Sequence, residues 1–306
     1  MDLYFGIDVA SKDFVSGNLD MGTVKVDNQL PAIKKFIKQL PQGAIMGIEA
    51  TGGYGTLLAD TAFEAGICVY IIRPDKVKKF REAGPERSKT DAIDAMVIRD
   101  YLETYINKLH TYSPLPALEA SIRKLSRKRD KIVQKLSDLR KTLRSLGDSV
   151  KQVQLILAPI EKRVLKCEQE LAKLVAQAQD AKVLFSITSV KLVTIASVLP
   201  AIRSIQFESK YALDSYFGMD LKANESGQKV GERHMSKQGD KRARKALYMA
   251  AVSAAGSKTF RGYYQMLKNE KKLKPKQALN ALARKILHII YGVYYSQTEF
   301  KAPTYS

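Results

Sequence analysis

The first third of the chain alternates between short apolar runs and amphipathic segments. The run LYFGIDV at residues 3–9 ends near an acid, precedes small polar residues and is typical of a buried strand. Two further runs flank a turn and predict a meander, whereas apolar residues at helical spacing after Pro31 predict a helix. The predicted strands are residues 3–9, 14–18, 23–27, 44–48 and 67–72, and the predicted helices are residues 31–40, 57–65 and 91–102. This order predicts an α/β layer with a mixed sheet.

A different period begins at residue 122. Two series of apolar residues follow steps of three and four, with Arg129 as one charged interruption and a junction near residues 147–159. The members are Ile122, Leu125, Ile132, Leu136, Leu139, Leu143 and Leu146, then Ile160, Val164, Cys167, Leu171, Leu174, Ala178 and Ala181. The pattern predicts either a helical hairpin or an oligomerising coiled coil, and the sequence alone does not choose between them.

The last part of the chain is basic and helical in tendency. The clearest helices are residues 243–255 and 277–295, and the polar stretch at residues 222–240 predicts a long loop. The segment YSPLP at residues 112–116 is typical of a domain boundary. We therefore expect three domains: an α/β domain at 1–112, a coiled-coil linker or oligomerisation hairpin at 113–182 and a mostly helical domain at 183–306.

The composition favours nucleic acid as a binding partner. The 306 residues contain 51 Lys and Arg against 31 Asp and Glu, a formal net charge of +20, which favours polyanionic partners. No segment is apolar enough for a membrane span and the N-terminus lacks a signal pattern, so we expect a cytoplasmic protein with no membrane partner. Cys68 and Cys167 are isolated, which argues against a disulfide framework and a thiolate zinc site, and the three His lie far apart without metal-ligand spacing.

Four acids form the main candidate site. Asp8 and Glu49 each end a predicted strand, where side chains project above an α/β sheet, and Asp91 and Asp94 share one face of a helix. Converging carboxylates suit Mg²⁺ or Mn²⁺, and two such ions about 4 Å apart can promote phosphodiester cleavage. The alternative is that the strand-end acids are turn residues and that Asp91 caps its helix.

Three motifs carry a family resemblance. GID at residues 6–8, IEATGGY at 48–54 and KTDAIDA at 89–95 resemble the DEDD catalytic domain of bacterial and archaeal insertion-sequence transposases that a bridge RNA guides. The N-terminal domain of that family is similar to the Holliday-junction resolvase RuvC and has an RNase H-like fold. The resemblance implies that Asp8, Glu49, Asp91 and Asp94 bind divalent metal.

A serine in the basic loop is the second candidate. The stretch Asn224-Glu225-Ser226-Gly227 resembles the family's C-terminal transposase domain, which implies that Ser226 attacks the scissile phosphodiester. Ser236, in a Ser-Lys-x-Gly stretch, is the rival nucleophile, although a phosphate contact or a helix-entry role suits it better. The family often has a Pro-Gly-x-Gly hairpin where this chain has residues 186–190 without glycine, which departs from its DNA-gripping pattern.

The leading hypothesis is an RNA-guided recombinase that acts on double-stranded donor and target DNA as a dimer or tetramer. The RNA partner rests on the resemblance alone. One alternative is a metal-dependent, structure-selective endonuclease that uses only the four acids, and another is a non-enzymatic nucleic-acid-binding scaffold. Two basic runs, at residues 123–131 and 237–245, suit phosphate binding or are simply solvated faces.

Overall fold

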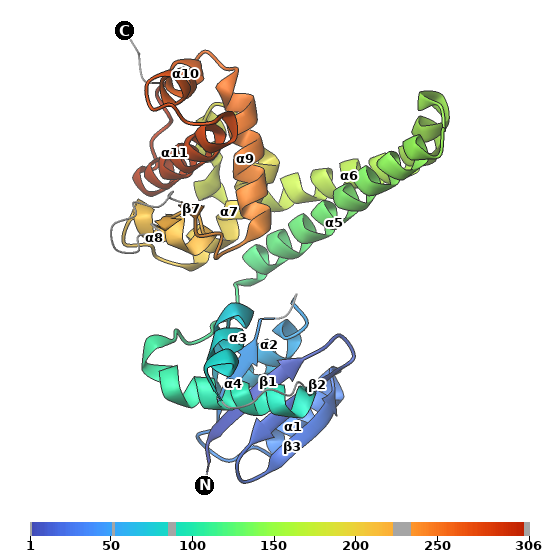
Figure 1. The fold of residues 1–306 in the computed structure, drawn as a ribbon, viewed down its shortest axis with the longest axis vertical. Coiled ribbons are helices and arrows are strands. Elements are labelled where there is room, and N and C mark those ends of the chain that lie inside the picture. Colours follow the sequence, from blue (N-terminus) through green and yellow to red (C-terminus); the bar gives the residue numbers. More distant parts are fainter. Residues whose placement is uncertain (1, 51–52, 85–89, 223–233, 303–306) are drawn as a thin grey trace. The chain divides into compact units, whose positions relative to one another are not determined.

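The chain folds into two compact units. The computed structural model describes residues 2–50, 53–84, 90–222 and 234–302, and it divides into Met1–Pro114 and Leu115–Ser306 (Figure 1). The division falls inside the segment that the sequence indicates as a boundary. The second unit includes both the long hairpin and the helices after it, so the separate functional roles expected of 113–182 and 183–306 stay predictions.

The first unit is built on a five-stranded sheet with the order β3-β2-β1-β4-β5. The strands are β1 (Tyr4–Val9), β2 (Asp13–Asn18), β3 (Gly22–Asp27), β4 (Ile45–Glu49) and β5 (Cys68–Ile72). The first three form an antiparallel meander, whereas β4 runs parallel to both β1 and β5. The predicted mixed α/β architecture is confirmed, and it is compatible with an RNase H-like DEDD domain.

Helices cover both faces of this sheet. On one face Phe5 and Ile7 pack with residues of α1 (Leu30–Lys38) and α2 (Thr56–Glu64). On the other face β5 packs with α3 (Pro74–Ala83) and α4 (Asp91–Tyr105), and a 3₁₀ turn, η1 (Ile106–Lys108), follows. The helix α3 was not predicted from the sequence, where Arg73-Pro74 marks the end of the preceding strand. Pro at the first helical position and Asp75 in the first turn are ordinary helix-start signals.

The second unit begins with a helical hairpin of α5 (Ala117–Ser145) and α6 (Val150–Gln177). The connection is shorter than expected, because Ser149 caps α6 and Pro159 lies inside that helix, so the junction predicted at 147–159 is wrong. The charged interruption at Arg129 forms two hydrogen bonds to Glu168 across the hairpin, at 2.8 and 2.7 Å. These contacts favour the hairpin alternative within one chain, while self-association through the same helices stays a prediction.

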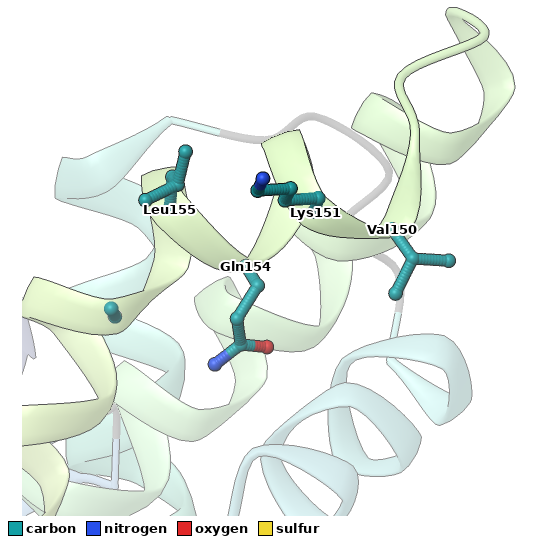
Figure 2. Close-up of a pocket in the computed structure, with 5 residues that line it drawn as sticks. Val150, Lys151, Gln154 and Leu155 are labelled. Carbon is teal, nitrogen blue, oxygen red and sulfur yellow. The ribbon is translucent and has the colours of Figure 1, made fainter.

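An apolar hollow lies near the start of α6. Figure 2 shows its lining residues, Val150, Lys151, Gln154, Leu155 and Ala158. The side chains of Val150 and Leu155 are 74% and 70% exposed, so they contribute little to the packing of this chain alone.

The remaining elements form a helical bundle around α7 and α11. They are η2 (Gln179–Ser186), α7 (Leu192–Ser204), α8 (Lys210–Phe217), β6 (Leu221–Lys222), β7 (His234–Met235), α9 (Lys241–Ala255), α10 (Arg261–Asn269) and α11 (Pro275–Ser296). Their core includes the buried Ile195, Leu247 and Ile286. A search of the described residues finds no helix with the length and apolar character needed to cross a membrane.

Candidate functional site

A row of glycines brings α4 close to the sheet. Gly6 of β1 pairs with Gly17 of β2 and with Gly47 of β4, so the three glycines lie side by side. A Cβ on Gly6 would come within 2.1 Å of the carbonyl oxygen of Ala95 in α4. The absence of these side chains therefore lets the helix backbone rest directly on the strands.

The first two acids follow from this register. Successive side chains in a strand point to opposite faces, so Asp8 lies on the same face as Gly6, and Glu49 on the same face as Gly47. Because Ile7 pairs with Ile48 in the parallel ladder, Asp8 and Glu49 are neighbours at the ends of adjacent strands. Both are half-buried on the side of the sheet that α4 covers.

The other two acids lie in the first turn of α4. The helix is capped by Thr90, whose side-chain oxygen accepts a hydrogen bond from the backbone N–H of Ile93 at 3.2 Å. The alternative in which Asp91 is the capping residue is therefore wrong. Asp91 is exposed and adds to the raised pKa of Lys25 on β3, although the ion pair between Lys25 and Asp13 is the larger cause.

Asp94 is the buried member of the four, only 7% exposed. Its Oδ1 lies 2.5 Å from Nη2 of Arg81 on α3, which makes Arg81 its counter-charge. The pair is poorly aligned, because within the described residues both Asp94 Oδ1 and Arg81 Nε are buried without a hydrogen-bond partner. Arg81 was not among the candidate residues predicted from the sequence, because the helix that carries it was not predicted.

The donor chemistry of these acids fits a divalent cation. Asp8 and Glu49 lie on the face of the sheet that α4 covers, and Asp91 and Asp94 lie in the first turn of α4. Within the described residues the buried Asp94 Oδ1 has no hydrogen-bond partner, although a buried oxygen needs one, and carboxylate oxygens are ligands that suit a divalent cation. The side chains are not gathered as in a bound site. Across residues 2–50, 53–84, 90–222 and 234–302, no three His, Cys, Asp or Glu side chains stand close enough together to hold one ion.

Ser226 lies outside the described residues, but the chain on either side of it is well ordered by contacts. Leu221 pairs with Met235 and Lys222 pairs with His234 in the β6–β7 ladder. A Cβ on Gly239 would come within 2.3 Å of the carbonyl oxygen of Tyr216, so the backbone before α9 touches the backbone of α8. This base holds both ends of residues 223–233 together.

The rival serine has a visible partner. The hydroxyl of Ser236 donates a short hydrogen bond to a carboxylate oxygen of Asp220, and the backbone N–H of Ser236 donates to the Asp220 carbonyl at 2.8 Å. Gln238 N–H also approaches the Ser236 hydroxyl at 3.5 Å. These contacts give Ser236 a role in closing the β6–β7 hairpin, while the exposed His234 lies on its surface.

The segment that departs from the family pattern contains one unusual backbone. Ser189, in residues 186–190, has a φ of +70° in the left-handed region that glycine adopts most easily. The chain therefore keeps a glycine-like turn at this place without the glycine.

Two family models match the chain. Residues 5–150 match a transposase model of the DEDD type named for IS110, and residues 181–265 match the model described as transposase IS116/IS110/IS902 family. The first match contains all four acids and the second contains both candidate serines. A comparison with curated proteins gives no match.

Proposed function

Because this chain belongs to the IS110/IS116/IS902 family of insertion-sequence transposases, we propose that it cuts and rejoins DNA strands with two sets of groups, the carboxylates of Asp8, Glu49, Asp91 and Asp94 and the hydroxyl of Ser226. The observation that carries this proposal is the placement of Asp8 and Glu49 beside each other under the helix that bears Asp94. Transposases act on DNA, so duplex donor and target DNA are the substrates that we propose.

The acids would hold Mg²⁺ or Mn²⁺. A DEDD transposase domain typically uses divalent metal, and a bound cation would act as a Lewis acid that polarises the scissile phosphate. Asp8 and Glu49 would hold the cation from adjacent strands, and Asp91 and Asp94 would hold it from the covering helix. Arg81 offsets the charge of the Asp94 carboxylate.

Ser226 would carry the covalent step. Its Oγ forms an ester bond with the scissile phosphorus, the phosphorus–oxygen bond to the departing strand breaks, and the departing oxygen takes up the hydroxyl proton. Cationic side chains of the second unit stabilise the charge of the pentavalent phosphorus. A nucleophile in the second unit and carboxylates in the first require both units to act on one phosphate, either within one chain or between two copies.

A guide RNA and self-association complete the proposal. The RNA rests on the family alone, since a basic surface does not distinguish RNA from DNA. The exposed side chains of Val150 and Leu155 on α6 support a dimer or tetramer in which a second copy covers them (Figure 2).

The test compares single substitutions of the nucleophile and of one acid. DNA with the element's ends is incubated with Mg²⁺, RNA transcribed from the element and the wild type, Ser226→Ala, Ser236→Ala or Asp8→Asn. We expect the wild type and Ser236→Ala to give a covalent protein–DNA adduct on denaturing gels, and Ser226→Ala and Asp8→Asn to give none. Adduct formation by Ser226→Ala would refute the serine assignment.

A structure-selective nuclease is the second candidate. It is favoured by the fact that the acids and their supporting glycines alone form a nuclease-like face. In this case Ser226→Ala cuts a four-way junction as fast as the wild type and without an adduct. If Asp8→Asn also cuts at the wild-type rate, the carboxylates are not catalytic, and if no protein cuts, a binding scaffold remains.

A further inference from the structure

The fold brings together two basic runs that are more than a hundred residues apart in sequence. Arg123 and Arg127 lie one turn apart on α5, and Arg242 lies in the first turn of α9. The electrostatic neighbours of Arg127 include both Arg123 and Arg242, so the beginnings of these two helices meet within the second unit (Figure 1). We call Arg123, Arg127 and Arg242 the arginine cluster.

The cluster carries unpaired positive charge. Within the described part of the chain, none of the three guanidinium groups has a carboxylate at ion-pair distance, and the Nε of Arg127 is buried without a hydrogen-bond partner. Burial lowers the pKa of Arg127, and the charge of Arg123 lowers it further. Asp240 opposes these effects, and the charge of Arg242 adds a smaller lowering of the pKa. Such repulsion between like charges is relieved when an anion binds.

The nearest acid does not neutralise the cluster. The side chain of Asp240 caps α9, where its Oδ1 accepts a hydrogen bond from the backbone N–H of Arg242 at 2.8 Å. The first turn of α9 adds further backbone N–H groups and the positive end of the helix dipole. The cluster therefore combines three guanidinium groups with the first turn of α9, which carries one of them.

The surrounding contacts fix α9 in position. Nη1 of Arg244 donates to the carbonyl oxygen of Phe217 at 2.9 Å, and Gly239 touches the backbone at Tyr216. The cluster therefore lies partly on a helix whose start is anchored to α8.

We propose that the arginine cluster binds the phosphodiester backbone of nucleic acid. Guanidinium groups match phosphate oxygens bidentately, and the half-exposed positions of the three arginines leave them accessible to a backbone. Because the contacts are to phosphate, the cluster positions the nucleic acid and does not read its sequence. This inference rests on the proposed action on nucleic acid.

The experiment measures salt-dependent binding by the full-length protein. Labelled duplex DNA and a structured RNA of matched length and unrelated sequence are titrated with wild type and Arg127→Gln/Arg242→Gln between 50 and 200 mM salt. Two lost phosphate contacts lower the slope of log affinity against log salt by about 1.8 on duplex DNA, which corresponds to a loss of up to about 60-fold at 0.1 M salt. A loss of affinity for the duplex in the double variant assigns the site to DNA, and a loss of affinity for the RNA assigns it to RNA. Either result supports phosphate binding by the arginine cluster.

Two controls separate this site from general charge. Arg163→Gln/Lys166→Gln removes the same charge from exposed positions of α6 and should leave the slope near the wild-type value. Arg127→Lys/Arg242→Lys keeps the charge and should retain most of the slope, which a merely structural role would not predict. A wild-type slope in the Gln variant, or an equal loss in the α6 variant, overturns the inference.

The failure of the site is distinguishable from the failure of the proposed function. Asp8→Asn should bind both nucleic acids as the wild type does while forming no adduct. If the wild type binds but Asp8→Asn still forms adduct, the proposed chemistry fails and the arginine cluster is unaffected.

Discussion

The close approach of the α4 backbone to Gly6 makes Gly6→Ala a strongly destabilising substitution. The new Cβ would lie 2.1 Å from the Ala95 carbonyl oxygen and 2.2 Å from the Arg99 nitrogen, where ordinary contacts begin at 3.4 Å. Both obstacles are backbone atoms of one helix, so no side-chain rotation relieves them. The helix α4 as a whole would have to move away from the sheet by about 1.3 Å, the difference between these distances.

The expected cost follows from this displacement. Overpacking that side chains can partly absorb costs about 1–3 kcal/mol, and a clash with rigid backbone lies at or above the upper end. We expect a loss of about 3 kcal/mol or more in the free energy of unfolding, which lowers the melting temperature by roughly 10 °C or more in a unit of this size. The movement also carries Asp94 away from Asp8.

The assay is thermal unfolding of the full-length protein, together with hydrogen exchange of peptides from β1 and α4 to assign the change to the first unit. Gly292→Ala on α11 is the matched control, because a Cβ there meets nothing within 4 Å. That variant should gain about 0.5–1 kcal/mol from improved helix propensity. A Gly6→Ala protein that melts within a degree of the wild type and keeps its β1 protection would refute the close-approach argument.

Three further predictions concern buried charge and backbone strain. Burial of Asp2 opposes its charge, but hydrogen bonds led by the Arg99 side chain lower the pKa of Asp2 to about 2. The lowered pKa contributes about 1–2 kcal/mol to the free energy of unfolding above pH 4, and this contribution is lost as the pH falls from 4 to 2. Asp2→Asn should not show this loss of stability in an acid titration. Arg203→Ala leaves the carboxylate of buried Glu119 unpaired and should lower the free energy of unfolding by about 3–5 kcal/mol in denaturant titrations. Replacing both Arg203 and Glu119 by apolar residues should recover most of the lost stability. Ser189→Gly should raise stability by about 0.5–1 kcal/mol, and a lower denaturation midpoint would contradict its left-handed strain.

Local patterns were sufficient to predict the strands and the alternation of the first unit. The apolar runs mark β1, β4 and β5 to within a residue or two, because most residues of these strands are buried under the helices that cover the sheet. The helix α3 was missed because Pro74 both ends a strand and starts a helix, and only the second reading accounts for Val77 and Phe80 one turn apart. Because α3 was not predicted, its residue Arg81, the counter-charge of Asp94, was not predicted either.

Contacts between distant segments could not be predicted in the same way. The heptad series marked Arg129 as an interruption, but its partner Glu168 depends on how α6 aligns against α5. Likewise, the meeting of Arg127 with Arg242 depends on the packing of the helices between them, which leaves no local signature. Asp91 shows the limit even for local signals, since Thr90 and Asp91 are both capable caps and only the backbone geometry selects Thr90.

The same three-residue pattern, glycine, isoleucine and acid, ends at Asp8 and at Glu49, and it has one physical explanation. Gly6-Ile7-Asp8 and Gly47-Ile48-Glu49 occupy equivalent places on adjacent parallel strands. In each triplet the isoleucine points into the core beneath α1 and α2, while the glycine and the acid point to the face under α4. The glycine lets α4 approach, and the approach in turn brings Asp94 to the level of the acids. The glycine and the acid of each triplet therefore serve the same site. Replacing the glycine should disturb this site by moving α4, and replacing the acid should disturb it by removing a carboxylate.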